Sequence, residues 1–286
     1  MSMGLVEQRR TPLCSPLCLT VSLIASIMIA PQANSGEPTA GQSIRLFNGQ
    51  NLDGWYVYTV ETKNDNPGVF QVIDGMIHVV GGKEDVGYFG GLITTQPYEN
   101  YRLRLEYKWG EKTYGIRKGK ARDSGVLLHC VGPDGPSPWP MSYEYQVEEG
   151  ATGDLWMVNL NERGGATKKM SLTCITESEL RNDQRYFKTG GTPFTFKDTG
   201  HQNWSGRDPG WKDEIGFRGR DDLESPHGEW TKCEIVARGN TLEYYVNGKL
   251  ANRLTDLSVR KGKILLQTEG AEVWYRNIEL ERLIKP

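Results

Sequence analysis

The chain has 286 residues, a length that one large all-β domain can fill. Charged residues make up 24% and hydrophobic residues 37% of it, an ordinary globular composition that excludes a largely disordered or fibrous chain. The 34 Lys and Arg residues are balanced by 36 Asp and Glu residues, so no excess of cations is available to neutralise a row of phosphates. The composition therefore argues against a nucleic-acid partner.

The first 35 residues have the pattern of an export signal. Arg9 and Arg10 precede an apolar run from Leu17 to Ala30, and small residues follow at Ala33 and Ser35. The run is shorter than the roughly 20 residues that cross a bilayer. We predict a signal peptide over residues 1–35, a periplasmic or secreted domain over residues 42–284, and no stable membrane anchor. The pattern does not indicate an oligomeric state.

Three cysteines remain beyond the predicted signal peptide: Cys130, Cys174 and Cys233. In an oxidising compartment two of them could form a disulfide and leave one buried thiol. None lies within CxxC spacing of another, which argues against a structural zinc site.

Hydrophobic residues alternate with polar ones along most of the chain. In Tyr101–Trp109 five apolar residues alternate with four charged ones, the pattern of a half-buried antiparallel strand. Asp74-Gly75, Gly239-Asn240 and Asn247-Gly248 mark tight turns between further strands. No series of amphipathic helices separates them. The pattern predicts an all-β sandwich of two antiparallel sheets.

Two segments depart from the alternating pattern. Thr176–Glu179 forms a capping box that could begin a short helix over residues 180–187, although no apolar stripe follows it. Residues 188–228 are rich in Gly, Pro, Asp and Trp and are expected to form a long ordered loop, which in a compact domain is usually functional.

Ten short blocks, spread in order from about residue 44 to residue 282, match a known family. They are Leu46 to Trp55, Val72 to Gly75, Gly91 to Thr95, Tyr98 to Tyr101, Asp123 to Val126, Tyr143 to Val147, Gly228 to Trp230, Val246 to Gly248, Leu265 to Gln267 and Tyr275 to Ile278. Together they resemble the 3-keto-disaccharide hydrolase family. The resemblance implies a concanavalin-like jelly roll with a concave sugar-binding face, and activity on glycosides oxidised to a ketone at C3.

The segment Tyr143–Glu148 is the strongest candidate for catalysis. In a strand, Glu144, Gln146 and Glu148 point to one face, and the alternate residues point to the other. Burying such a row without polar partners is costly, so a wet, sugar-binding face is the better explanation. An exposed outer strand is the alternative.

The preceding strand and its flanks contribute further candidates. Asp123 and His129 would share one face, which could bring an imidazole close to the acids. His129 could equally be a hydrogen-bonded core residue. Arg122 and Lys108 are candidate donors to substrate oxygens. Trp139 and Trp204 are candidate sugar-stacking rings, with loop packing as the alternative.

A divalent metal ion is a further, weaker hypothesis. His201 and His227 flank the long loop, which also carries Asp208, Asp213, Asp221 and Asp222. These side chains offer oxygen and nitrogen ligands, but no metal-specific spacing connects them. We therefore assign no metal ligands and no certain cofactor.

The implied substrate suggests a mechanism. A ketone at C3 acidifies the proton at C2, so a base could abstract it, the C1 substituent could leave, and water could add. We expect Glu144 or His129 as the base, Glu148 as the acid, and Gln146 with Arg122 or Lys108 as donors. Two alternatives stay open: an ordinary glycoside hydrolase and a carbohydrate-binding module without catalysis.

Overall fold

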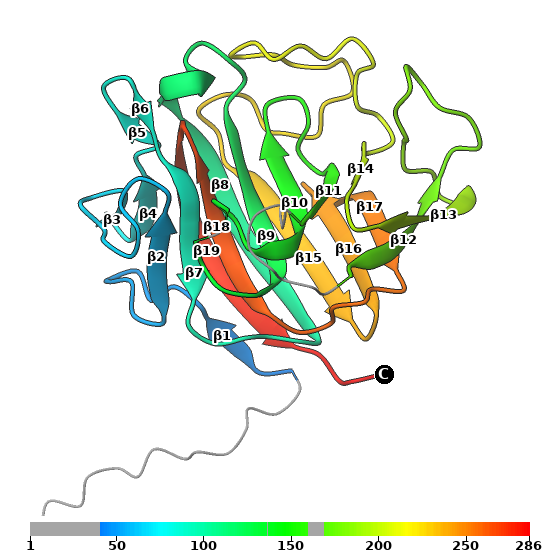
Figure 1. Ribbon diagram of the computed structural model, residues 1–286, viewed down its shortest axis with the longest axis horizontal. Coiled ribbons are helices and arrows are strands. Elements are labelled where there is room, and N and C mark those ends of the chain that lie inside the picture. Colours follow the sequence, from blue (N-terminus) through cyan, green and yellow to red (C-terminus); the bar gives the residue numbers. More distant parts are fainter. Residues whose placement is uncertain (1–40, 136, 160–168) are drawn as a thin grey trace, which may run out of the picture. The chain divides into compact units, whose positions relative to one another are not determined.

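The computed structural model describes residues 41–135, 137–159 and 169–286. The predicted signal peptide lies outside this part of the chain. Strands dominate the described residues, and two antiparallel sheets stack to form the sandwich that the alternating pattern predicted (Figure 1). The architecture is a concanavalin-like jelly roll, as the resemblance implied. The segment that joins the two sheets after β14 runs beyond one end of them, in yellow at the top of Figure 1.

The larger sheet has ten strands. In spatial order they are β13 (Thr192–Lys197), β12 (Ser171–Thr176), β17 (Lys249–Thr255), β16 (Thr241–Val246), β15 (Thr231–Arg238), β8 (Tyr101–Thr113), β19 (Ala271–Arg282), β4 (Met76–Val79) and β3 (Phe70–Ile73), with β1 (Ser43–Arg45) also paired to β19.

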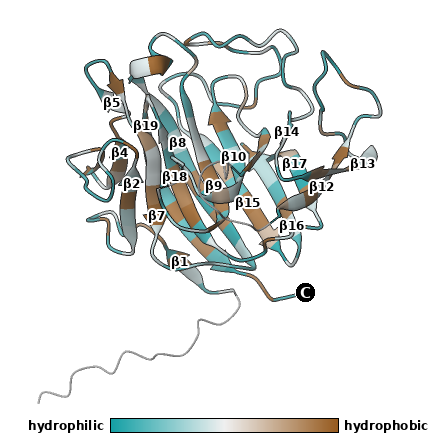
Figure 2. Ribbon diagram, in the orientation of Figure 1, coloured by the Kyte–Doolittle hydropathy of each residue, from teal (hydrophilic) through white to brown (hydrophobic). Residues whose placement is uncertain are grey.

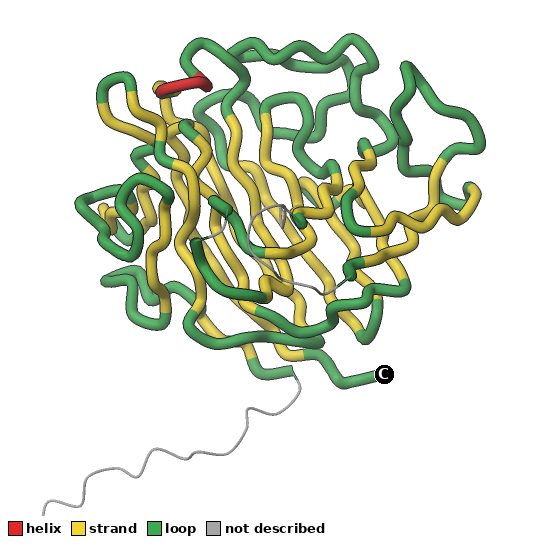
Figure 3. The backbone as a smooth tube through the Cα atoms, viewed as in Figure 1, coloured by secondary structure: helices red, strands yellow, loops and turns green. Residues whose placement is uncertain are grey.

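The smaller sheet has seven strands. In spatial order they are β14 (Gly200–Gln202), β11 (Leu155–Val158), β10 (Met141–Glu148), β9 (Asp123–Val131), β18 (Lys263–Glu269), β7 (Phe89–Thr94) and β2 (Trp55–Thr59). A separate two-stranded hairpin joins β5 (Gly82–Lys83) to β6 (Val86–Gly87). A single 3₁₀ turn, η1 (Gly115–Arg117), follows β8 and is the red segment of Figure 3.

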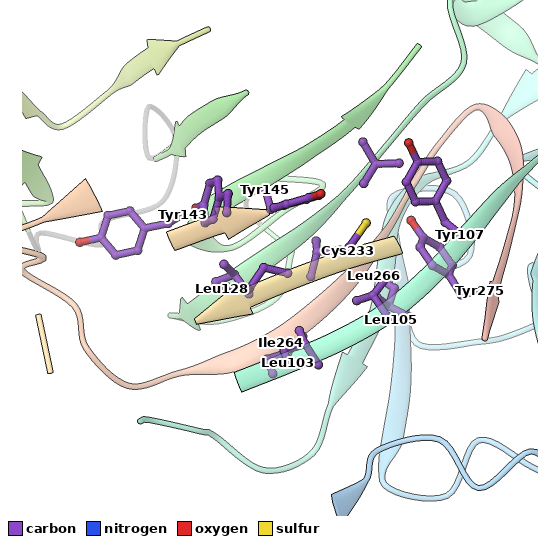
Figure 4. Close-up of a cluster of buried hydrophobic side chains, with 14 of the residues drawn as sticks. Leu103, Leu105, Tyr107, Leu128, Tyr143, Tyr145, Cys233, Ile264, Leu266 and Tyr275 are labelled. Carbon is purple, nitrogen blue, oxygen red and sulfur yellow. The ribbon is translucent and has the colours of Figure 1, made fainter. Parts of the chain in front are cut away.

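The hydrophobic core lies between the two sheets. Alternate residues of each strand point inward, which gives the brown and teal banding of Figure 2. Tyr143, Tyr145 and Leu266 of the smaller sheet pack with Leu105 and Tyr107 of the larger one (Figure 4). All five are nearly inaccessible to solvent. Because both sheets contribute, neither can be stable without the other.

The outer faces of the two sheets differ in character. On the ten-stranded sheet the outward residues are charged and paired, as in Arg104 with Glu234 at 2.8 Å and Arg276 with Glu106 at 2.7 Å. On the seven-stranded sheet the outward face carries buried acids, amides and aromatic rings. We call this second surface the open face.

Two local expectations were wrong. Residues 180–187 form no helix: after β12 ends at Thr176 the chain makes a tight turn, with Arg181 bridged to Gln184 and paired to Glu177. Residues 188–228 are not loop throughout, because β13 and β14 occupy 192–197 and 200–202. The long loop is confined to residues 203–230. Threonine and phenylalanine alternate in β13, a signal the Gly-rich flanks obscured.

The three cysteines of the described domain are free and buried. Cys174 and Cys233 lie in the main core, and Cys130 lies in a smaller apolar cluster on the open face. Within the described ranges, the search for a helix long and apolar enough to span a membrane found none.

Shortening a core side chain should destabilise the sandwich. Leu266→Ala removes a side chain that is 0% exposed and leaves a cavity between the sheets, so we expect the free energy of unfolding to fall by about 2–5 kcal/mol. Leu180→Ala is the matched control, because Leu180 is 49% exposed and its loss should cost about 0.5 kcal/mol or less. Urea denaturation measures both. Equal losses in the two variants would contradict the assigned core.

Candidate active site

Strand register arranges the open face into three rows that cross the sheet. The first, the aromatic row, runs from His201 through Trp156 and Glu144 to Leu127 and Leu265, each paired with the next. Directly paired residues of antiparallel strands share a face, with Cβ atoms roughly 5 Å apart. The five side chains therefore lie side by side across five strands.

The second row, the glycine row, consists of two glutamines and two glycines. Gln146 pairs with Gly125, and Gln267 pairs with Gly91. A side chain at Gly125 would collide with the carboxyl of Glu144 and the amide of Gln267. The ends of Glu144 and Gln267 fill the space above Gly125, and the side chain of Leu265 fills the space above Gly91.

The third row, the acid row, consists of Glu148, Asp123 and Glu269. Glu148 pairs with Asp123 across β10 and β9, and Glu269 lies beside Asp123 at the end of β18. Three carboxyl groups thus stand next to one another on one face. With Glu144 in the first row, four acids occupy this part of the open face.

These rows form the floor of a pocket of about 720 Å³. Its walls come from segments beyond the sheet: Arg117 from η1, Trp139 from the loop before β10, and Arg207 and Trp211 from the long loop. The volume lies in the range of small-molecule sites. The acids of the sheet therefore face a walled pocket that stays open to solvent on one side.

Arg117 is the cation that neutralises the acid row. Its Nη2 lies 3.0 Å from Asp123 Oδ2 and 3.0 Å from Glu148 Oε1, and it donates to the carbonyl oxygen of Ala121 at 2.8 Å. Gln146 donates to Asp123 Oδ1 at 2.9 Å and to Glu148 Oε2 at 3.4 Å. One guanidinium and one amide thus hold two carboxyls in place.

One arginine does not compensate four acids, and the pKa values reflect this imbalance. Burial, with repulsion from Glu269 and Glu148, raises the pKa of Glu144 well above its ordinary range. The same causes raise the pKa of Asp123, against the opposing effect of Arg117. Burial raises the pKa of Glu269 to about 7. The carboxyls of the cluster therefore hold their protons to a higher pH than isolated carboxyls would.

Glu148 and Glu144 differ in what surrounds them. Burial raises the pKa of Glu148, but Arg117 and Arg207 oppose that rise. Glu144 is 5% exposed, and its Oε1 atom has no hydrogen-bond partner. An uncompensated buried carboxyl keeps its proton, whereas one beside a guanidinium tends to lose it. Glu148 is thus the better carboxylate and Glu144 the better acid.

A second buried ion pair supports the pocket wall. Arg207 pairs with Asp154, which is 0% exposed and also accepts from the backbone nitrogen of Trp204 at 2.7 Å. His201 Nε2 lies 3.4 Å from Asp154 Oδ2, the same oxygen that Arg207 contacts. This carboxyl therefore fixes Arg207 and His201 relative to the sheet.

The structure places His129 in the core, not on the open face, so its expected position was wrong. His129 has φ of +53°, and the pairing of β9 with β10 slips between Met141 and Tyr143. This β-bulge turns the ring inward, edge-on to Tyr101 and Tyr143. Burial lowers its pKa to about 4, while its Nδ1 lies 3.1 Å from the carbonyl oxygen of Val259.

Three of the predicted substrate-binding residues also lie elsewhere. Arg122 is buried against Glu149, with its Nη1 2.6 Å from Oε1. Lys108 lies on the outer face of the ten-stranded sheet, over the ring of Trp230. Trp204 is 5% exposed and belongs to the core. In each case the residue type was suitable, but the alternation or the loop path directs it away from the pocket.

The other predicted residues line the pocket: Asp123, Trp139, Glu144, Gln146 and Glu148. Reasoning from the sequence missed Arg117, Trp156, Arg207, Gln267 and Glu269 as members of the same site. Gln267 and Glu269 follow Leu265 at two-residue intervals, so they share its face of the strand. Extending the period-two pattern of that strand could have found them. Arg117 lies in an irregular segment, where periodicity gives no signal.

No group of three or more His, Cys, Asp or Glu side chains among the described residues is arranged to hold a metal ion. His227 instead pairs with Glu111 at 3.0 Å, and Asp213 lies 3.3 Å from Lys120. The weak metal hypothesis for the long loop thus gains no support from the geometry.

A jelly roll with an acid-lined and tryptophan-lined pocket on one sheet is typical of carbohydrate-active proteins. The chain belongs to the family of the 3-keto-alpha-glucoside-1,2-lyase-like domain, whose family model matches residues 42–281. This agrees with the resemblance seen in the sequence blocks. No curated protein sequence matches the chain.

Solved structures with a similar chain path include a candidate glycosyl hydrolase from Parabacteroides distasonis. It has 20% sequence identity and a TM-score of 0.48, with 85% of this chain and 94% of that chain covered. A β-glucanase from Bacillus licheniformis has 12% identity and a TM-score of 0.42, with 87% and 100% covered. Carbohydrate-binding module CBM66 from Bacillus subtilis has 10% identity and a TM-score of 0.41, with 81% and 97% covered.

The raised pKa of Glu269 predicts a pH-dependent stability. Its proton stabilises the folded state fully below pH 4.5, the ordinary value, and this contribution is lost as the pH rises through about 7. Glutamine at position 269 has no proton to lose. As the pH rises from 4.5 to 8, the free energy of unfolding of Glu269→Gln should therefore increase relative to that of the wild type by on the order of 2 kcal/mol. Thermal unfolding at several pH values measures this difference. Curves that run parallel over the whole range would contradict it.

Proposed function

We propose that the protein cleaves glycosides whose sugar carries a ketone at C3. In this proposal the enzyme abstracts the C2 proton, eliminates the C1 substituent, and adds water to the product. The family membership supports the substrate class. The observation that carries the proposal is that four acids line one pocket together with Arg117, which contacts two of them at 3.0 Å.

Elimination requires a base and an acid in the same site at the same pH. A set of carboxyls whose environments push their pKa values apart meets this need. Glu148, beside Arg117, is the proposed base, and the buried Glu144 is the proposed acid. This assignment reverses the one expected from the sequence, because the cation was not recognised there.

Two carboxyl groups carry the protons through the proposed reaction. The Glu148 carboxylate takes the proton from C2, and the electron pair moves onto the ketone oxygen. The enolate then forms a C1–C2 double bond and expels the C1 oxygen, which takes the proton of Glu144. Water adds to C1, its proton returns to Glu144, and the proton on Glu148 returns to C2. The net change is hydrolysis of the glycosidic bond.

The enolate oxygen needs a hydrogen-bond donor while it carries charge. Asp123 is the proposed donor, because burial and repulsion from Glu269 and Glu148 raise its pKa and so favour the protonated form, against the opposing effect of Arg117. A neutral carboxylic acid in a pocket can donate in this way. Gln146 is committed to Asp123 and Glu148, so we assign it a positioning role.

We also propose that the enzyme acts outside the cytoplasm, on the basis of the predicted signal peptide over residues 1–35. Sequencing the amino terminus of protein recovered from the periplasm or the medium would find a chain that begins near residue 36. An intact Met1 in that protein would overturn the predicted cleavage, and recovery from the cytoplasm alone would overturn the export proposal; neither outcome affects the chemistry.

Replacing either proposed catalytic acid should abolish turnover. We expect Glu144→Gln and Glu148→Gln each to lower kcat/KM on a 3-keto-glucoside by about 100-fold or more, since each removes a proton-transfer group. Both amides keep the size of the side chain, and circular dichroism checks that the sandwich still forms. Chromatographic detection of the released leaving group measures the rate.

Glu279→Gln is the matched control, because Glu279 lies half-exposed on the outer face of the ten-stranded sheet. It should keep full activity. Full turnover by both pocket variants would refute the assignment. Equal cleavage of the matched glucoside without the ketone would favour an ordinary glycoside hydrolase. Sugar affinity without cleavage of either compound would favour a binding module.

A further inference from the structure

One large aromatic ring on the open face is only partly covered by protein. Trp156 of β11 is 42% exposed, although the residues on either side of it, Leu155 and Met157, are buried. An indole that stays half exposed to water loses part of the favourable free energy that large side chains gain when their apolar surface is buried. Trp156 also lines the acid-bearing pocket, so its free surface faces the space that a ligand would fill.

The covered side of Trp156 is supported by a fixed partner. The imidazole of His201 stacks on it, with ring centroids 4.0 Å apart and an interplanar angle of 16°. His201 is held in turn by Asp154, which is 0% exposed. The Trp156 and His201 rings, which we call the ring stack, are therefore preorganised as a flat platform.

The position of the ring stack relates it to the proposed acid. Trp156 is the direct cross-strand partner of Glu144, so the indole and this carboxyl are neighbours on one face. Trp139 stands at the other side of Glu144, against the apolar cluster that contains Leu127 and Leu265. The indole nitrogen of Trp139 donates to the carbonyl oxygen of Gly90 on β7 at 3.0 Å, so three to four strand spacings, roughly 14–19 Å, separate it from Trp156 on β11. That span has room for two sugar rings, with Glu144 between them.

We propose that the ring stack is the binding site for the leaving group, and that it selects leaving groups with a flat apolar face, such as a second pyranose or an aryl ring. This inference rests on the proposed function, because it assigns the leaving group to the side of the acid. C–H faces of sugars and aromatic rings pack well on indole. The half-exposed end suits the variable part of a substrate. The end near Trp139, whose ring is partly buried against the apolar cluster, suits the oxidised sugar.

The test compares leaving groups in one enzyme. Wild type, Trp156→Ala and Trp156→Phe are assayed on 3-keto-glucosides that carry a phenyl, a glucosyl or a methyl leaving group. We expect Trp156→Ala to lower kcat/KM about tenfold for the phenyl and glucosyl compounds and less than about twofold for the methyl compound. Trp156→Phe keeps a flat ring and should retain most of the activity.

Trp274→Ala is the matched control. Trp274 stacks on His78 with almost the same geometry, 3.9 Å and 16°, but on the outer face of the ten-stranded sheet. It should leave all three substrates unaffected. Equal losses for methyl and phenyl compounds in Trp156→Ala, or no loss for any compound, would overturn the proposal.

A binding measurement separates this inference from the proposed function. Calorimetric titration with an unoxidised disaccharide of glucose and with methyl glucoside needs no turnover. Suppose that the wild type cleaves no 3-keto-glycoside, yet binds the disaccharide more tightly than methyl glucoside, and that Trp156→Ala binds the two equally. The ring stack would then be confirmed as a binding site, and the proposed chemistry would be refuted. Equal affinity of wild type and Trp156→Ala for the disaccharide would remove the platform whatever the activity.

Discussion

The site depends on the cost of burying several negative charges beside one positive charge. Asp123, Glu144, Glu148 and Glu269 share a pocket in which Arg117 contacts two of them at 3.0 Å. Buried carboxyls that lack a cation retain protons, because an unpaired charge in a low-dielectric site is heavily penalised. Differences in protonation among chemically similar groups then follow from position alone, and these differences are what the proposed elimination uses.

The β-sandwich determines where the side chains of the pocket lie. Tyrosines and leucines on the inner faces fix the two sheets against each other, and strand register then determines which outward residues stand side by side. The aromatic, glycine and acid rows follow from that register. Loops contribute Arg117, Trp139, Arg207 and Trp211, so the floor of the pocket is set by the sheet and its charge balance by the loops.

The sequence predicted the sheet better than it predicted the site. Alternation in Tyr143–Glu148 correctly separated the core face from the pocket face, because a regular strand keeps period two. The same rule failed at His129, where a β-bulge reverses the face of the residues beyond it. Arg117 could not be found by periodicity, since a tertiary contact places its irregular segment over the acids. The catalytic roles depend on that contact, so they could not follow from the strand pattern.

The buried carboxyl of Glu224 determines how the pocket can respond to a ligand. Its Oε1 accepts from the Tyr107 hydroxyl and from Trp109 Nε1 at 2.9 Å, and its Oε2 accepts from the Gly150 nitrogen at 2.9 Å. The end of the long loop is thereby fastened to β8 and to the turn after β10. A wall anchored in this way is already ordered before a ligand binds. Binding therefore costs little conformational entropy of the loop.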